Sequence, residues 1–148
     1  MRILCLVVGL AVFPVLANAQ EPLLPALRSA TQARSRDAQA FAAYGRALTR
    51  AGHWDEALRA LKRARELERG SLTAMLAEAN VYFLRLDFRG ARNACRHLET
   101  ADAEATLTRV CRARAFLVLN RSARAFEELE AALAAAPNDY DVLMVLGD

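Results

Sequence analysis

The sequence predicts an all-α protein built from antiparallel helix pairs, and three observations carry this prediction. First, apolar residues between positions 38 and 71 recur at the three- and four-residue spacing that places side chains on one face of a helix. Second, Gly52 interrupts this pattern with a residue that readily takes the positive φ at which helices end. Third, the same order of small and large residues returns over positions 72–105 and again over 106–139, without a gap. The sequence therefore predicts a stack of similar two-helix units.

The first unit, residues 38–71, is the most regular copy. Asp37, or Ser35 before it, is suited to cap its first helix. The apolar face of that helix is marked by Phe41, Tyr44 and Leu48. The apolar face of the second helix is marked by Trp54, Ala57, Leu58, Leu61 and Ala64. This spacing predicts two helices that pack face to face across the turn at residues 51–53.

Two columns of the alignment remain small in every copy. Gly45 aligns with Ala79, Ala113 and Gly147, and Ala57 aligns with Ala91 and Ala125. The pattern resembles the tetratricopeptide repeat, a helix-turn-helix unit of about 34 residues. Pro137 resembles the proline that closes many such units. The resemblance implies a tetratricopeptide-type α-solenoid in which the units form a core only by stacking.

On this basis the chain divides into six segments. They are a signal peptide (1–19), a linker or helical lead-in (20–37), three repeats (38–71, 72–105 and 106–139), and the start of a fourth repeat or an end cap (140–148).

The first segment has the features of a secretory signal. Arg2 precedes an apolar run that Pro14 interrupts, and small residues at 17–19 suit cleavage after Ala19. The alternative is a retained membrane anchor, but the apolar run at positions 3–17 falls short of the roughly 20 residues that span a bilayer. We therefore expect an exported protein, periplasmic or else secreted or envelope-associated, with no membrane insertion after cleavage.

The last segment is apolar where a stack usually ends in a polar helix. Residues 142–146 read VLMVL, and Leu143 and Leu146 stand where a further first helix would begin. Either these residues form a short end cap, or a partner or further sequence covers them. Self-association through this apolar end is a further expectation.

Charge and composition argue against several other functions. The 20 basic residues exceed the 17 acidic ones by only three, and the basic residues are spread along the helices among acids and not gathered in one stripe, so we expect no nucleic-acid partner. His53 and His97 stand apart, and Cys95 and His97 are two residues apart on a helix and point to different faces. The sequence predicts no catalytic residues, no metal site and no cofactor.

Cys95 and Cys111 are the two cysteines that remain after cleavage, in a compartment where disulfides persist. They stand seven residues before and nine residues after Asp102, near the turn between two neighbouring helices, so they lie at similar heights. A disulfide between the second and third repeats is therefore feasible. The alternative is that Cys95 is a small core residue in the column of Leu61 and Leu129.

Arg109 and Arg112 break the pattern because they replace Phe41 and Tyr44 of the first repeat. Arg112 can pair with Glu78, one repeat earlier, or else the third first-helix is rotated and half exposed. The acidic run Glu127, Glu128 and Glu130 is expected to be a solvated helix face.

The resemblance also implies a binding surface. In this family the first helices of successive repeats line a concave groove that holds a protein or peptide. The matching positions form an apolar floor with an arginine rim, unless their apolar members pack between repeats instead. These positions are Arg46, Arg50, Leu76, Asn80, Phe83, Leu84, Arg114 and Leu117.

Family members that bind the terminal carboxylate of cytosolic chaperones use lysine and asparagine side chains in this groove. Ala42 stands at the first lysine position here, and only Asn80 and the arginines resemble the set, so the sequence disfavours that ligand. We expect an exported, non-catalytic protein-interaction module. The alternative is the N-terminal repeat portion of a larger envelope assembly or export machine, whereas an enzyme is the class with the least support.

Overall fold

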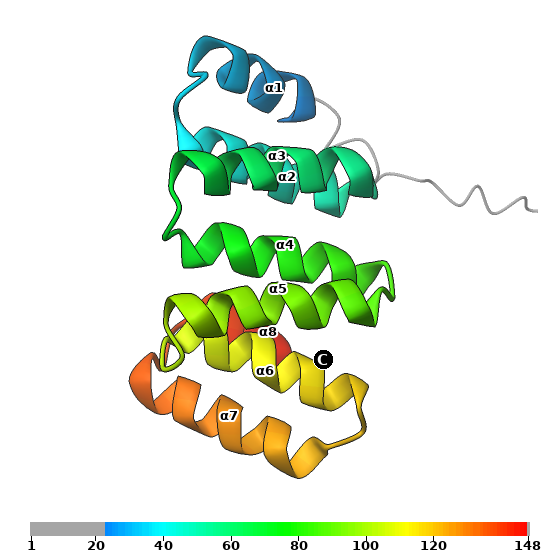
Figure 1. Ribbon diagram of the computed structural model, residues 1–148, viewed down its shortest axis with the longest axis vertical. Helices are drawn as coiled ribbons and strands as arrows, with labels where there is room; N and C mark the ends of the chain where they lie inside the picture. Colours follow the sequence, from blue (N-terminus) through cyan, green and yellow to red (C-terminus); the bar gives the residue numbers. More distant parts are fainter. Residues whose placement is uncertain (1–22, 148) are drawn as a thin grey trace, which may run out of the picture.

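The protein forms an elongated stack of short helices in a computed structural model that describes residues 23–147 (Figure 1). All regular secondary structure within this range is helical. The helices are α1 (Leu23–Ala33), α2 (Ala38–Arg50), α3 (Trp54–Leu67), α4 (Leu72–Leu84), α5 (Phe88–Ala101), α6 (Thr106–Val118), α7 (Ser122–Ala135) and α8 (Tyr140–Gly147). The expected signal peptide lies outside the described residues.

Three antiparallel pairs make up the body of the stack. The pairs α2/α3, α4/α5 and α6/α7 each lie within one of the expected repeats, and successive pairs pack through α3 on α4 and α5 on α6. Helix α1 packs on α2 at one end (blue in Figure 1), and α8 packs against α6 and α7 at the other. The all-α solenoid that the sequence predicts is thus the fold that the structure shows.

Aspartates begin several of these helices. The Asp37 carboxylate accepts hydrogen bonds from the backbone N–H groups of Gln39 (2.9 Å) and Ala40 (3.1 Å) at the start of α2. Asp87 accepts one from the N–H of Gly90 (2.9 Å) at the start of α5. Such caps satisfy backbone donors that have no partner within the helix.

The turn inside each pair uses the same backbone conformation. Gly52, Leu86 and Asn120 occupy equivalent positions of successive repeats, and all three have positive φ, at 80°, 59° and 54°. Glycine takes this conformation without strain and asparagine takes it readily, whereas leucine does not. The second repeat therefore places a strained residue where the first has a relaxed one.

The small columns of the alignment are buried where the helices of a pair cross. Ala57, Ala79, Ala91, Ala113 and Ala125 are each 0% exposed. A Cβ built on Gly45 would lie 2.6 Å from Cγ of the fully buried Leu61, closer than side chains approach one another. The close contact between α2 and α3 thus depends on glycine at this position.

Helix α4 is enclosed by α2, α3, α5 and α6. Its residues are buried around most of its circumference: Ala74, Met75, Leu76, Ala77, Ala79 and Val81. A helix that is apolar on all sides is typical of a central position. The second repeat is therefore the centre of the core that joins the two ends.

The arginines that break the repeat pattern pair within the third repeat. Arg112 lies 2.8 Å and Arg109 3.4 Å from Glu128 of α7, while Glu78 lies 3.5 Å from Arg65. Of the two alternatives considered for Arg112, the pair with Glu78 is therefore wrong, because α7 packs closely on α6 and brings a carboxylate nearer. Glu128 is likewise not part of a solvated face, since its side chain is only 20% exposed.

Cys95 of α5 and Cys111 of α6 face each other in the core. Their Sγ atoms lie 1.99 Å apart and their Cα atoms 5.6 Å apart, which is the geometry of a disulfide. Both residues are also almost fully buried, so they serve as core side chains as well. Cys95 therefore combines the two roles considered for it, that of a disulfide partner and that of a buried core residue.

Candidate interaction surface

The first helices of the pairs lie next to one another along one face. Helix α2 contacts α4, α4 contacts α6, and α6 contacts α8. Of the residues expected in a groove on this face, Arg46, Arg50, Leu84 and Leu117 are exposed, and Asn80, Phe83 and Arg114 are half-buried. All seven have side chains that reach the surface.

Leu76 is the exception among the expected groove residues. Its side chain is 2% exposed and packs in the core with Met75, Ala79 and Cys95. The enclosure of α4 by four other helices explains this error, because little of its circumference is open to solvent. Leu76 is a packing residue and does not line an open groove.

A pocket of about 210 Å³ lies where α4, α6 and α8 meet. Its lining is apolar except for one arginine: Phe83, Leu84, Arg114, Leu117, Val118 and Val145. Nη1 of Arg114 donates a hydrogen bond to Oδ1 of Asn80, which holds the guanidinium beside the pocket. Five of the expected residues thus come together here. We call this site the groove pocket.

The two remaining arginines lie elsewhere. Arg46 lines a separate and more polar depression between α2 and the start of α4, together with Gln39 and Glu68. Arg50 stands at the exposed end of α2 and lines neither site. The structure therefore gathers three residues of the expected apolar floor, Phe83, Leu84 and Leu117, but neither Leu76 nor one continuous arginine rim.

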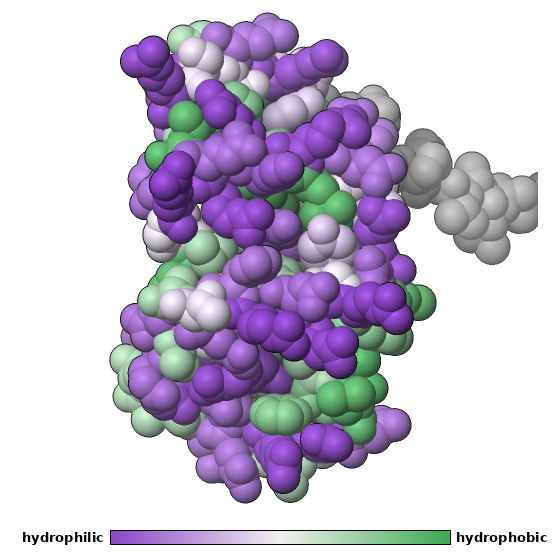
Figure 2. Space-filling model, viewed as in Figure 1, coloured by the Kyte–Doolittle hydropathy of each residue, from purple (hydrophilic) through white to green (hydrophobic). Residues whose placement is uncertain are grey.

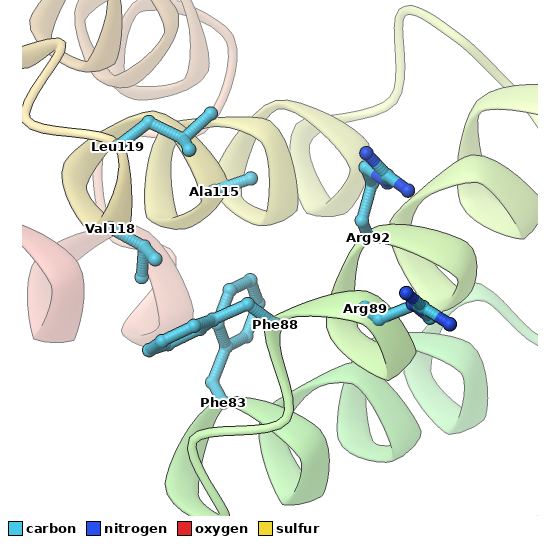
Figure 3. Close-up of a pocket in the computed structure, with 7 residues that line it drawn as sticks. All are labelled: Phe83, Phe88, Arg89, Arg92, Ala115, Val118 and Leu119. Carbon is cyan, nitrogen blue, oxygen red and sulfur yellow. The ribbon is translucent and has the colours of Figure 1, made fainter.

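A larger pocket of about 350 Å³ lies on the other side of Phe83 and Val118, between α5 and α6 (Figure 3). Both of those side chains line both pockets. The lining residues from α5 are Phe88, Arg89 and Arg92, and those from α6 and its end are Ala115, Val118 and Leu119. The rings of Phe83 and Phe88 lie at one side, and the two guanidinium groups lie at the other (Figure 3). We call this site the edge pocket.

Large apolar side chains surround the edge pocket at the helix turns. Leu84 is 57% exposed, Leu86 71%, Phe88 48% and Leu119 61%. Figure 2 shows hydrophobic residues along the edge, at right, where the α4–α5 and α6–α7 turns lie in Figure 1. Sequence reasoning missed Leu86, Phe88 and Leu119 as surface residues because it treated the turns as connections. The signal was present: Leu86 aligns with Gly52 and Asn120, both typical turn residues.

The apolar C-terminal segment divides between the core and the surface. Val142 and Val145 are buried, whereas Tyr140 is 72% and Leu143 48% exposed. Helix α8 therefore contributes to the core with one face and leaves part of another uncovered. Self-association through this end stays a prediction.

Within residues 23–147, no helix has the length and apolarity needed to cross a bilayer. The same residues contain no cluster of three or more histidine, cysteine or acidic side chains arranged to hold a metal ion.

Comparison with known proteins supports the fold. No family model matches the sequence, and no curated protein matches it. Among solved structures, the thermophilic TPR protein TTC0263 of Thermus thermophilus matches with a TM-score of 0.69 and 20% identity, covering 85% of this chain and 70% of that one. The first TPR of Spaghetti (RPAP3), bound to the HSP90 peptide SRMEEVD, has a TM-score of 0.60 at 20% identity and covers 76% and 89%.

A third structure, YrrB, is described as a TPR protein with an unusual peptide-binding site. It matches with a TM-score of 0.61 and 20% identity over 79% of this chain and 60% of that one. At these identities the likeness establishes the fold alone. The chain has the architecture of a tetratricopeptide-repeat solenoid.

Proposed function

We propose that this chain is an exported, non-catalytic interaction module that binds a segment of another protein in the groove formed by α2, α4 and α6. The observation that carries the proposal is the groove pocket, where Leu84, Leu117 and Val118 remain partly exposed beside Arg114. An apolar pocket with one fixed cation suits a peptide with an apolar anchor and a nearby carboxylate. Structures of the same fold that bind peptides support this class of partner.

The groove differs from a site built around a cluster of lysines. Ala42 is 7% exposed and Arg114 is already hydrogen-bonded to Asn80. Most of the contact surface at the groove pocket is therefore apolar. We infer that apolar side chains provide most of the affinity and that Arg114 orients the ligand.

The test is a pull-down from envelope extract, with bound proteins identified by mass spectrometry. The double variant Leu84→Ser, Leu117→Ser should lose the specifically bound protein, because it makes the exposed part of the pocket polar. Phe126→Ser is the matched control, since Phe126 is 55% exposed on α7 and lies outside the groove pocket. Equal capture by both variants would contradict groove binding.

Arg46→Glu separates the two parts of the expected groove. If the ligand extends from the groove pocket along α4 to α2, this charge reversal should weaken capture as well. Unchanged capture by Arg46→Glu, with loss in the Leu84/Leu117 variant, would confine the site to the last two repeats.

Export is a separate part of the proposal and rests on residues 1–19. N-terminal sequencing of protein recovered from the periplasm or the culture medium should show Gln20 as the first residue. Recovery of an uncleaved chain in the membrane fraction would favour the retained anchor instead.

A further inference from the structure

The edge pocket differs from the groove pocket in its charge. Arg89 and Arg92 line it, and neither forms an ion pair with a described acidic side chain. Some other arginines of the stack are paired, as Arg85 is with Asp55 at 2.8 Å and Arg65 is with Glu78 at 3.5 Å. The two guanidinium groups beside this apolar cavity outnumber the single carboxylate of Asp87, which directly precedes Phe88 in the chain, so the rim of the cavity carries a net positive charge.

The positive charge of the edge pocket comes from its two arginine side chains. Helix α5 begins at Phe88, and the Asp87 carboxylate at its N-terminus accepts a hydrogen bond from the N–H of Gly90, so the helix end already has a negative partner. A carboxylate from outside the chain would meet the forked donors of Arg89 and Arg92.

The apolar half of the edge pocket is open at the surface. Phe88 and Leu119 are about half or more exposed, and Leu86 extends the same surface onto the turn. Leu86 also has a φ of 59°, which is an unfavourable backbone conformation for leucine, and its exposed side chain gains little burial that could offset this cost. Contact with a ligand would explain why a large apolar residue occupies this strained and exposed position.

The two walls of the edge pocket are held together beneath it. Cys95 lies three residues after Arg92 on α5, and Cys111 lies four residues before Ala115 on α6, so the sulfur pair sits about one turn from the pocket on both helices. Because the spacing between α5 and α6 is fixed, the two helices lose less conformational entropy when a ligand binds between them.

We propose that the edge pocket is a second binding site, distinct from the groove, for an extended protein segment that carries a large apolar side chain next to acidic residues. The apolar side chain enters between Phe88 and Leu119, and the neighbouring carboxylate binds Arg89 and Arg92. At about 350 Å³ the cavity is at the small end of ligand pockets, which suits one anchoring side chain. The cavity and the two arginines would thus favour segments in which a large apolar residue lies next to an acidic one.

The experiment uses a phage-displayed library of random short linear peptides, panned on the purified protein. Enriched peptides should share a large apolar residue beside aspartate or glutamate. Their affinity should fall roughly tenfold or more in the double variant Arg89→Glu, Arg92→Glu and should weaken as ionic strength rises. Leu119→Ser should also reduce binding, because it removes the apolar contact.

The matched control is Arg96→Glu, Arg124→Glu. It makes the same change in net charge at two exposed arginines that lie outside the edge pocket, so it should leave peptide binding unchanged. Circular dichroism establishes that each variant is folded.

Three outcomes would overturn the proposal. The first is enrichment of no peptide, and the second is binding that survives Arg89→Glu, Arg92→Glu. The third is self-association of the protein that only this variant abolishes, which would make a second copy the occupant. If the affinity of the peptides falls only in the variant Leu84→Ser, Leu117→Ser, they bind in the groove pocket. The two sites are thus tested separately.

Discussion

The turn of the first repeat is formed by Ala51, Gly52 and His53, whereas the equivalent turns of the next two repeats carry Leu86 and Leu119. All three turns follow the same backbone path, with positive φ at Gly52, Leu86 and Asn120. Both of the pockets that we assign to binding lie in the second and third repeats and in α8. The first repeat thus has a turn of small and polar residues, while its neighbours place exposed leucines on the same backbone path.

The two regions also differ in how their helices are held together. The first repeat relies on close contact, with Gly45 against Leu61. The third repeat has small buried residues at its crossing as well, Ala113 and Ala125, and adds charge pairs: Arg109 and Arg112 share Glu128, and Arg109 also pairs with Glu104. Cys95 and Cys111 add a cross-link between the second and third repeats. The binding region therefore has polar and covalent contacts in addition to its apolar core.

The largest expected effect comes from breaking the cross-link. Reduction should lower the free energy of unfolding by about 3 kcal/mol, because the bond closes a loop across a separation of 16 residues. Urea unfolding with and without reductant measures this change. Hydrogen exchange should quicken more in α5 and α6 than in α2 and α3. Alkylation of both Cys95 and Cys111 in unfolded, unreduced protein would show that the bond does not form.

The next largest effect tests close packing in the first repeat. Gly45→Val should destabilise the fold by about 2 kcal/mol or more, because its Cβ would overlap the buried side chain of Leu61. Thermal or urea unfolding measures the loss. Gly70→Val is the control, since no atom lies within 4 Å of a Cβ built there, and it should change stability by less than about 0.5 kcal/mol. Equal effects of the two substitutions would mean that α2 and α3 can separate at little cost.

Much of the fold followed from the regular period of the sequence. The spacing identified the small positions at the helix crossings, and Ala79 and Ala113 are both 0% exposed. A period identifies residues that every repeat needs, because the same geometric constraint acts at each of those positions. This is why the helix pairs could be predicted from the sequence's own period, whereas the resemblance to the tetratricopeptide repeat implied how the pairs stack.

The binding surface could be predicted only in part. Leu76 was assigned to the groove because its position faces outward in a single repeat, but α4 is enclosed by four other helices. The Arg112–Glu128 pair depends on how α7 lies on α6, which a pairwise alignment of repeats does not contain. The edge pocket was missed because it is formed between two repeats, from residues whose neighbours are distant in sequence.

A smaller effect should come from exchanging residues at the two unequal turns. Leu86→Asn should stabilise the protein by roughly 1 kcal/mol, because asparagine tolerates positive φ and the leucine side chain is mostly exposed. The reverse change, Asn120→Leu, should destabilise it by a similar amount. Both shifts can be measured as changes in the urea midpoint. Opposite signs would show that Leu86 is favourable for folding and would remove one argument for its role in binding.

The smallest effect concerns Tyr82, which stands where the first repeat has Leu48 and the third has Phe116. Gly90 makes room for its ring, since a Cβ there would contact Tyr82 Cδ1. Burial raises the pKa of the Tyr82 phenol above its usual value of 10.0, with Glu78 and Asp87 adding to the rise and Arg85 and Arg65 opposing it.

Because the pKa is higher in the folded state, the neutral phenol stabilises the fold, and this contribution is complete below pH 10 and is lost as the pH rises through the folded pKa. The free energy of unfolding of the wild type should therefore decline above pH 10 more steeply than that of Tyr82→Phe, while the difference between them stays constant at lower pH. Parallel declines of the two proteins above pH 10 would show that the Tyr82 hydroxyl is as well solvated in the fold as in the unfolded chain.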